Sequence, residues 1–312
     1  MKKRQSVTAF SFAYISLFIK YRHMTFDSKT NRYPYPEYTD QHYLHVKKDN
    51  GLVFDENYPY VDKSKGFVFK QKMTRLLLNI MVFPLTYIRL GLRVKGKENI
   101  KKYKDVLKKG VISVCNHVHM WDYLGIMAAV RPHKTNILAW APNVRGENSS
   151  MMRSVGAIPV PDGNMKGTFA YFEAIKNLLT KDGGWLHIYS EGSMWEYYAP
   201  IRPFKKGAAY FAVANDRPII PLAYSYRPAS WWRRKIMKQL AVFTLTIGEP
   251  LFPNKDLSKT EQELDLTIRS HDAVCKLAGI DPKDNPYPAV FNKSKRVDYY
   301  TDTYGVGYKG SW

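Results

Sequence analysis

The sequence predicts an α/β fold, with a mostly parallel central sheet of about seven strands flanked by helices. Short apolar runs rich in β-branched residues recur from about residue 92 onward, and stretches with helical periodicity lie between them. Strands that alternate with helices are expected to form a parallel sheet, because each helix carries the chain back to the starting edge of the sheet. No internal repeat interrupts this alternation.

The expected strands are short apolar runs. They cover residues 92–95, 111–115, 136–140, 156–160, 185–190, 219–226 and 241–248. The expected helices cover residues 121–130, 165–181, 206–215 and 258–278. The last helix has the strongest end signals, with a capping box formed by Ser258 and Glu261 and a terminating Gly279.

A chain of 312 residues is long enough for one large domain with an appendage. We predict a membrane-associating and irregular N-terminal segment at 1–90, the main domain at 91–284 and an extended tail at 285–312. Residues 21–65 are rich in Tyr, Pro, Asp and Asn, and the tail is polar and aromatic without a clear period. Both compositions are typical of irregular structure.

Two apolar stretches lie in the N-terminal segment. Residues 7–19 follow a basic start and lack a small-residue cleavage site, so we interpret them as a membrane-surface or packing helix and not as a cleaved signal. The second stretch, 67–91, is nearly free of charge over 76–88 but is interrupted by Pro84. No stretch reaches the roughly 18 to 20 apolar residues that a spanning helix needs. The second stretch therefore predicts a broken helix in the membrane interface or a buried core helix.

The chain is strongly basic. Its 48 Lys and Arg residues outnumber 27 Asp and Glu residues, which leaves a net charge of +21. This surplus indicates an anionic partner, such as nucleic acid, an anionic membrane, a phosphorylated substrate or an acidic carrier protein. No motif supports a non-enzymatic nucleic-acid binder. Cys115 and Cys275 are far apart and predict neither a disulfide framework nor a cysteine-based zinc site, which fits a reducing compartment.

Residues 113–125, "SVCNHVHMWDYLG", hold two histidines and an aspartate behind an apolar run. His117 and His119 would face the same side of a strand, as in the H-x-H-x-D-H pattern of metallo-β-lactamase-like hydrolases. Asp122 comes one residue too late for that pattern, and Tyr123 stands where its last histidine belongs. A metal-dependent hydrolase that uses His117, His119 and Asp122 is the alternative hypothesis.

His117 and Asp122 also form a candidate acid/base pair. Side chains five residues apart on one helix differ by about 140° and cannot meet. They can meet if His117 lies in the turn after a strand and Asp122 in the first turn of the next helix, and turn-prone Asn116 supports that break. Asp122 would then accept a hydrogen bond from Nδ1 and leave Nε2 free as a general base. The alternative is a histidine that caps a helix without a catalytic role.

Four sequence blocks resemble the glycerolipid acyltransferase family, the PlsC-like lysophosphatidic acid acyltransferases. "NHVHMWD", 116–122, resembles its N-H-x-x-x-x-D block, and "YSEGS", 189–193, resembles its F-P-E-G-T-R block. "GAIPV", 156–160, and "FKKGAAYFAVANDRPIIPLAY", 204–224, resemble two further blocks, and 91–100 resembles the entry strand. A lone H-x-x-x-x-D is a weak signal, whereas the ordered set is specific.

The resemblance implies a 1-acylglycerol-3-phosphate O-acyltransferase-like enzyme, with 91–284 as its catalytic domain. Such enzymes move a fatty acyl group from a thioester, on CoA or acyl carrier protein, to a hydroxyl of a lysophospholipid or related glycerolipid. They use no cofactor beyond this co-substrate. His117 would deprotonate the acceptor hydroxyl and Asp122 would orient it. The chain has no G-x-S-x-G elbow, so a serine acyl-enzyme is not expected.

The resemblance also implies an acceptor site. Its expected residues are Asn116, Glu191, Gly192, Ser193, Arg202, Lys205 and Lys206. Glu191 would bind a glycerol hydroxyl, and Gly192 would let the backbone approach closely. The family usually has an arginine for the acceptor phosphate where this chain has Met194.

A phosphate needs a fixed charged partner. Residues that could supply it from another position are Arg153, Arg202, Lys205 and Lys206. Alternatively, Trp195, Tyr197 and Tyr198 indicate a more apolar or sugar-bearing acceptor.

The expected partners are an anionic membrane surface, acyl-CoA or an acidic acyl carrier protein, and a lysolipid acceptor, but no nucleic acid. The expected location is the cytoplasmic face of a membrane, as a peripheral or monotopic protein. Residues 231–238, "WWRRKIMK", combine interfacial aromatics with positive charge, as a membrane-edge anchor would. The alternative for this stretch is a solvated charged helix that buries one tryptophan.

Overall fold

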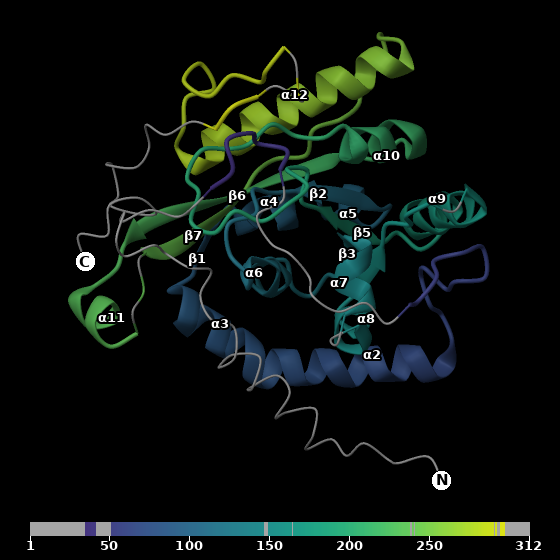
Figure 1. Cartoon of the computed structure of the whole chain (residues 1–312), viewed down its shortest axis with the longest axis horizontal. Helices are drawn as coiled ribbons and strands as arrows, with labels where there is room; N and C mark the ends of the chain where they lie inside the picture. The colour runs from purple at the N-terminus through teal and green to yellow at the C-terminus, as the bar shows by residue number, and fades with distance from the viewer. Residues whose placement is uncertain are drawn as a thin grey trace.

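The structure of the protein is a computed structural model. It describes residues 35–41, 51–146, 149–163, 165–237, 239, 241–289, 291 and 294–296. Within these residues a seven-stranded sheet lies between two layers of helices (Figure 1). Helices α10 (Gly207–Asn215) and α12 (Lys259–Ala278) cover one face, and α6 (Asp122–Ala129) covers the other. The α/β class predicted from the alternating pattern is confirmed.

The strands agree closely with the predicted apolar runs. They are β1 (Arg93–Lys95), β2 (Val111–Val114), β3 (Thr135–Ala139), β4 (Ala157–Pro159), β5 (Trp185–Ile188), β6 (Ile219–Pro228) and β7 (Ala241–Ile247). Their order across the sheet is β1-β7-β6-β2-β5-β3-β4. The central strands β2 and β5 are buried along their whole length, which explains why they appear in the sequence as continuous apolar runs.

The sheet is mixed, because β6 and β7 pair antiparallel while the other neighbouring strands pair parallel. Pro228, the last residue of β6, lies opposite Ala241, the first residue of β7. The short helix α11 (Trp231–Lys235) joins the two strands at that end and reverses the chain. Strands β7 and β1 therefore run against the other five. Apolar run length does not encode this reversal.

All four predicted helices are present, as α6, α9 (Met165–Thr180), α10 and α12. The capping box of α12 forms as expected, with Ser258 and Glu261 satisfying each other's backbone N–H groups. Four short helices were not predicted, because four to six residues are too few for a periodic pattern. They are α4 (Lys97–Lys102), α5 (Lys104–Leu107), α7 (Ala141–Arg145) and α8 (Ser149–Ser154). The alternative for 231–238 was a charged helix that buries one tryptophan; α11 is helical, but both of its tryptophans are exposed.

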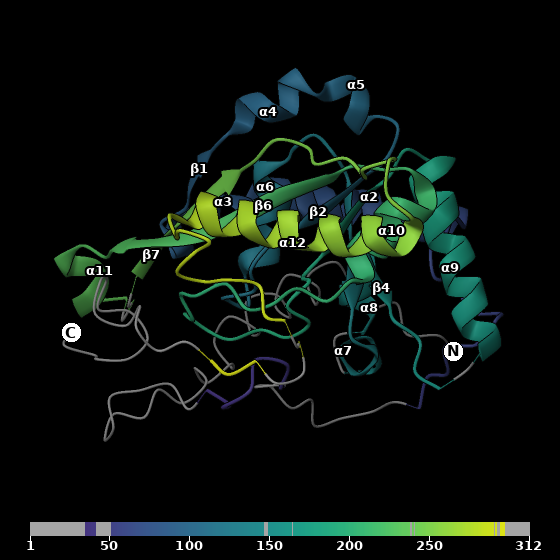
Figure 2. The same ribbon diagram turned by 90° about the horizontal axis from the view of Figure 1, so that it is seen from above.

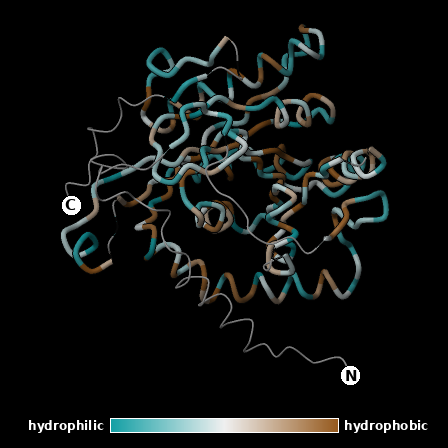
Figure 3. The backbone as a smooth tube through the Cα atoms, viewed as in Figure 1, coloured by the Kyte–Doolittle hydropathy of each residue, from teal (hydrophilic) through white to brown (hydrophobic). Residues whose placement is uncertain are grey.

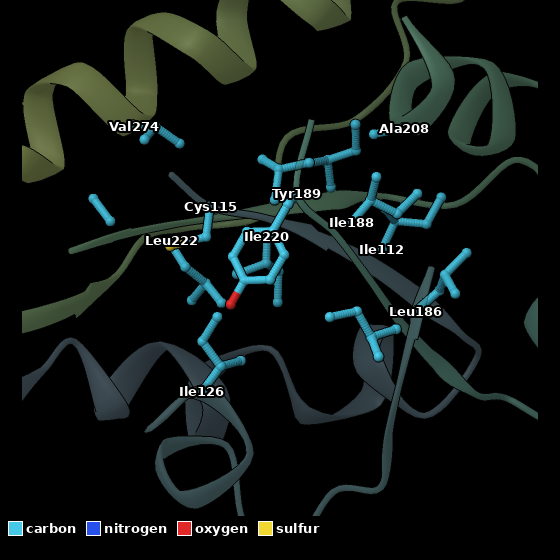
Figure 4. Packing of buried hydrophobic residues seen from close by; sticks show 14 of the residues in the cluster. Ile112, Cys115, Ile126, Leu186, Ile188, Tyr189, Ala208, Ile220, Leu222 and Val274 are labelled. Atoms are coloured by element: carbon cyan, nitrogen blue, oxygen red, sulfur yellow. The ribbon is translucent and has the colours of Figure 1, made fainter. Parts of the chain in front are cut away.

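Apolar side chains from both helical layers meet on the sheet and form its core. Figure 4 shows Ile112 and Leu222 of the sheet between Ile126 of α6 on one side and Val274 of α12 on the other. Each of these residues is fully buried. This packing fixes α6 against the strand ends, which matters because the first residue of α6 is Asp122.

The apolar stretch 67–91 forms one continuous helical segment instead of a helix broken at Pro84. It consists of α2 (Lys65–Leu77), a π-helical turn η1 (Leu78–Val82) and α3 (Phe83–Leu90). Pro84 lies in the first turn of α3, directly after the wide π turn, where its missing N–H costs little.

Among the described residues, Lys65–Leu90 is one helix long and apolar enough to cross a membrane by length and composition. The prediction that no stretch is long enough was therefore wrong. The other predicted apolar helix, 7–19, lies outside the described residues.

The two ends of the described chain pair with each other. Tyr38 bridges Lys295, and the Thr39 N–H donates to the Ser294 carbonyl at 3.0 Å. The ring of Tyr35 stacks on Trp195, in the long loop between β5 and α10, with ring centres 5.4 Å apart. This loop lies at the opposite end of the sheet from α4 and α5 (Figure 2). The predicted division into 1–90, 91–284 and 285–312 stays a prediction.

Candidate active site

The histidine stretch connects β2 to α6 at the end of β2. Asn116 sets the path of the chain where it leaves the sheet, because its side chain pairs with the backbone of β6 like another strand residue. Its Oδ1 accepts the Tyr224 N–H at 2.8 Å, and its Nδ2 donates to the Tyr224 carbonyl at 3.0 Å. Asn116 is fully buried. The geometry therefore favours a structural role for Asn116 over the predicted contact with the acceptor.

His117 and Asp122 meet as the turn-and-helix arrangement requires. His117 Nδ1 lies 2.8 Å from Oδ2 of Asp122, the first residue of α6. The same oxygen accepts the N–H groups of Val118 at 2.9 Å and His119 at 3.2 Å. The Asp122 side chain is 1% exposed and that of His117 is 23% exposed. Within the described chain no residue hydrogen-bonds to Nε2 of His117, so this nitrogen is available to a substrate.

Tyr189 completes the pair from the end of β5. Its hydroxyl donates to Oδ1 of Asp122 at 2.6 Å, and its ring stacks on the His117 ring at 3.8 Å between centres. Burial, followed by the charge of Asp122, raises the pKa of the Tyr189 hydroxyl well above its ordinary value, so the phenol remains a donor. Sequence reasoning missed this residue. The available signal was a tyrosine where the family pattern has phenylalanine.

The Asp122 carboxylate is ionised in spite of its burial. Burial alone would raise its pKa, but the His117 ring and the hydrogen bonds from Tyr189 and Val118 outweigh burial and lower the pKa. The Tyr224 hydroxyl donates to the Asp122 carbonyl at 2.6 Å and fixes the start of α6. Gly125 leaves room for that hydroxyl, because a Cβ there would lie 2.3 Å from its oxygen.

Glu191 holds the backbone of His117. Its Oε2 accepts the His117 N–H at 3.0 Å, and its two oxygens also accept from the backbone and guanidinium of Arg202 at 2.9 and 2.8 Å. Glu191 is buried. Because protein donors already occupy both carboxylate oxygens, the geometry favours a positioning role over the predicted contact with a glycerol hydroxyl.

Arg202 is buried inside the loop and is not presented to an acceptor. Its Nη1 donates to Ser193 Oγ at 2.9 Å and to the Thr39 carbonyl at 3.2 Å, and its guanidinium lies over Trp195. The side chain is 1% exposed and paired with Glu191. A buried guanidinium needs such a partner, so the geometry favours a structural ion pair over the predicted phosphate contact.

Lys205 is the predicted cation that lies at the turn following Glu191. Gly192 adopts a φ of +81°, and a Cβ there would lie 2.8 Å from the Lys205 Nζ. The Lys205 N–H donates to the Ser190 carbonyl at 2.7 Å, which joins the two segments. Lys205 and Lys206 are exposed, and neither forms an ion pair within the described residues.

The side chains that indicated an apolar or sugar-bearing acceptor are buried in the fold. Trp195, Tyr197 and Tyr198 pack among other aromatic rings and do not face solvent. Arg153, the remaining candidate for a phosphate, donates to the Pro59 carbonyl and packs over Tyr58. Neither observation supports an acceptor contact from these residues.

The geometry gives no support to the metal-dependent hydrolase. Nδ1 of His119 accepts the Trp121 N–H at 3.1 Å, and its ring packs between Tyr197 and Phe243. Across the described ranges, no three His, Cys, Asp or Glu residues lie close enough together to hold a metal ion.

Comparison with known proteins gives a family match for the part of the chain that holds this site. Residues 91–225 match the model of the family described as Acyltransferase, and they include the His117–Asp122 pair, Tyr189 and Lys205. The crystal structure of the 1-acyl-sn-glycerophosphate (LPA) acyltransferase PlsC from Thermotoga maritima is similar over 68% of this chain and 84% of that chain, with 16% identity and a TM-score of 0.38. No curated protein matches the sequence. The family match thus covers residues 91–225, and it confirms the enzyme class that the motifs predicted.

Proposed function

We propose that the enzyme transfers a fatty acyl group from acyl-CoA or acyl carrier protein to a hydroxyl of a lysophospholipid or related glycerolipid. The observation that carries the proposal is the 2.8 Å contact between His117 Nδ1 and the ionised, buried Asp122. It lies within the acyltransferase match, and no residue of the described chain hydrogen-bonds to Nε2 of His117. Such a pair is suited to remove a proton from an alcohol.

In the proposed reaction Nε2 of His117 takes the proton of the acceptor hydroxyl as its oxygen attacks the thioester carbonyl. The C–S bond then breaks, the acyl group stays on the acceptor oxygen, and the thiol leaves with the proton returned by His117. Asp122 stabilises the transient imidazolium through Nδ1, and Tyr189 and the Val118 N–H hold Asp122 in place. General base catalysis of this kind typically contributes roughly 10²- to 10⁴-fold in rate.

Lys205 is our candidate for an anionic head group on the acceptor. Its ammonium lies against the Gly192 turn, one residue from Glu191, which in turn binds the His117 N–H. A phosphate held there would stand near the base. If the acceptor carries no phosphate, Lys205 has no such partner, so acceptors with and without phosphate distinguish the two cases.

The α2–η1–α3 segment provides the proposed membrane contact. A stripe of exposed apolar residues runs along it at helical spacing, and it comprises Phe69, Met73, Leu76, Ile80, Leu85 and Ile88. Figure 3 shows apolar residues recurring along this segment at the edge of the fold. We propose that the stripe lies in the cytoplasmic face of a membrane containing anionic lipids, which also suits the net charge of +21.

An acceptor panel tests the proposed function. Protein in detergent micelles is mixed with a donor whose acyl group is labelled, either acyl-CoA or acyl carrier protein that bears the acyl group. The acceptor is lysophosphatidic acid, lysophosphatidylcholine or monoacylglycerol. We expect a new ester product with at least one acceptor, and release of the free thiol in equal amount. Hydrolysis of the thioester without ester formation on any acceptor would contradict the proposal.

A further inference from the structure

Helix α11 lies at the edge of the molecule, where β6 turns back into β7. It exposes large apolar side chains, because Trp231 is 66% exposed and Ile236, just past its end, is 74% exposed. Trp232 is exposed as well. In Figure 1 α11 lies beside the C-terminal end of α3. These side chains contribute nothing to the core, so their exposure needs another explanation.

α11 is held against α3 by specific hydrogen bonds. Arg233 Nη1 donates to the Ile88 carbonyl at 2.8 Å and to Gln239 Oε1 at 2.8 Å. Gln239 in turn donates to the Arg89 carbonyl, and Arg89 donates to the Met237 carbonyl. These contacts tie α11 and the residues that follow it to the last turn of α3. The apolar side chains of α11 are thus presented from a fixed position.

The apolar surface of α11 is next to the exposed stripe of α3. Ile88 belongs to that stripe, and its carbonyl receives the Arg233 hydrogen bond. Arg234 and Lys235 are exposed between Trp231 and Ile236, and neither pairs with an acidic side chain in the described part of the chain. Tryptophan flanked by Lys and Arg favours the boundary between lipid headgroups and acyl chains, where the ring is buried and the cations reach phosphate.

This corner of the molecule lies close to Glu196, in the long loop between β5 and α10. Burial raises the pKa of the Glu196 carboxyl in this loop to about 7, and the charge of Arg89, at the end of α3, acts in the opposite direction. The residues on either side of Glu196 are bound to the histidine stretch, because the Trp195 N–H donates to the His117 carbonyl at 3.0 Å and the Tyr197 N–H donates to the Val118 carbonyl at 2.9 Å. Only the loop segment around Glu196 therefore separates His117 from a membrane bound at α11 and α3.

We propose that α11 is a second membrane contact, in which Trp231, Trp232 and Ile236 enter a bilayer and Arg234 and Lys235 bind its anionic headgroups. Together with the exposed apolar stripe of α2–η1–α3, it orients the histidine stretch toward the lipid surface. The inference rests on the proposed function in one respect, since it explains how a lipid acceptor reaches His117. We assign a membrane as the partner, because exposed apolar and cationic side chains lie together on this short helix.

A site-specific probe tests this contact separately from other membrane anchors. Ile236→Cys and, as a matched control, Met165→Cys on α9 are labelled with an environment-sensitive fluorophore; the native Cys115 and Cys275 are buried and free. Met165 is exposed like Ile236. It begins α9, which lies at another edge of the fold than α11 (Figure 1). With phosphatidylcholine vesicles containing phosphatidylglycerol, we expect a blue shift and protection from an aqueous quencher at 236 only. A probe at 236 that stays in water on vesicle-bound protein would overturn the proposal.

Activity provides the second readout. Trp231→Ser/Ile236→Ser should lower the rate on vesicle-borne acceptor by about tenfold or more and leave the rate in detergent micelles unchanged. The control pair Met165→Ser/Phe169→Ser removes similar exposed surface from α9 and should change neither rate.

Charge reversal and self-association complete the test. Arg234→Glu/Lys235→Glu should weaken binding to the anionic vesicles by about tenfold or more and have little effect on neutral vesicles. Self-association without lipid that is lost in the Trp231→Ser/Ile236→Ser variant would assign the surface to a second copy of the chain instead. If wild-type protein forms no ester even in detergent, the proposed function fails, whereas the fluorophore result still decides the membrane contact.

Discussion

The Tyr189 hydroxyl donates a 2.6 Å hydrogen bond to Asp122, on the carboxylate oxygen that His117 does not use. The two carboxylate oxygens are thus held from opposite sides, one by the β5 end and one by the histidine stretch. The Tyr189 ring also stacks on His117. One side chain therefore orients both members of the proposed base pair.

Tyr189→Phe should keep the ring stack and remove the hydrogen bond. With one donor fewer, the pKa of the buried Asp122 carboxyl should rise above its wild-type value. The pH titration profile of the Asp122 carboxyl, followed by NMR, measures this shift. Tyr123→Phe removes a phenol hydroxyl from α6 that bonds to Thr135 and not to Asp122, and its profile should match the wild type. Identical profiles for all three proteins would show that the hydroxyl does not tune Asp122.

Asp122→Asn should remove the charge and keep the shape. An amide oxygen can still accept from Val118 and His119, so the loop should persist, while the imidazolium loses its counter-charge. We expect kcat to fall by roughly 10²- to 10⁴-fold with little change in KM. Steady-state kinetics at saturating donor checks this. An unchanged kcat would mean that His117 does not become charged in the rate-limiting step.

The same variant gives a pH prediction for stability. Because the folded-state pKa of Asp122 is lowered, its ionised form contributes stability above about pH 4, and this contribution is lost as the pH falls through the folded-state pKa. Asp122→Asn lacks this contribution. Urea denaturation as a function of pH should therefore show a smaller loss of stability on acidification than in the wild type. An equally steep loss in both proteins would contradict an ionised Asp122.

The Glu191–Arg202 pair should be sensitive to removal of one partner. Arg202→Met leaves a buried carboxylate without its counter-ion, and such a change typically costs about 3–5 kcal/mol of unfolding free energy. The double variant Glu191→Gln/Arg202→Met should cost less than the sum of its single changes, because neither charge is left alone. Breaking the more exposed Lys63–Asp182 pair should cost only about 0–1 kcal/mol. Additive costs at the buried pair would argue against the coupling.

Lys205→Ala should discriminate among acceptors. If Lys205 binds a head-group phosphate, its loss should raise KM for phosphate-bearing acceptors by roughly tenfold or more and leave phosphate-free acceptors unaffected. Lys206→Ala is the matched control, since Lys206 is also exposed but is the N-cap residue of α10. Equal effects of both variants on both acceptor types would remove Lys205 from the acceptor site.

Much of the fold was predictable from local pattern. Short β-branched runs and four periodic stretches predicted the strands and main helices, because burial on a sheet or on a helix face leaves that pattern in sequence. The direction of β7 was not predictable, since it depends on α11 reversing the chain. The continuity of the helix through Pro84 depends on the π turn before it, which has no reliable sequence signature.

The site was predictable only where its parts are close in sequence. His117 and Asp122 are five residues apart, and turn-prone Asn116 revealed the break that lets them meet. The role of Tyr189 depends on β5 lying beside β2, and the role of Glu191 depends on a loop that returns Arg202 to it. The motif resemblance predicted that Glu191 and Arg202 contact the acceptor, whereas in the structure both are buried and form an ion pair with each other.

The most direct test of the account is the initial rate of ester formation in His117→Ala. The account predicts a loss of at least about 100-fold in kcat, with normal folding by circular dichroism. His133→Ala, which changes a histidine outside the site, should retain the wild-type rate. A His117→Ala enzyme that forms the ester at the wild-type rate would contradict the proposed mechanism.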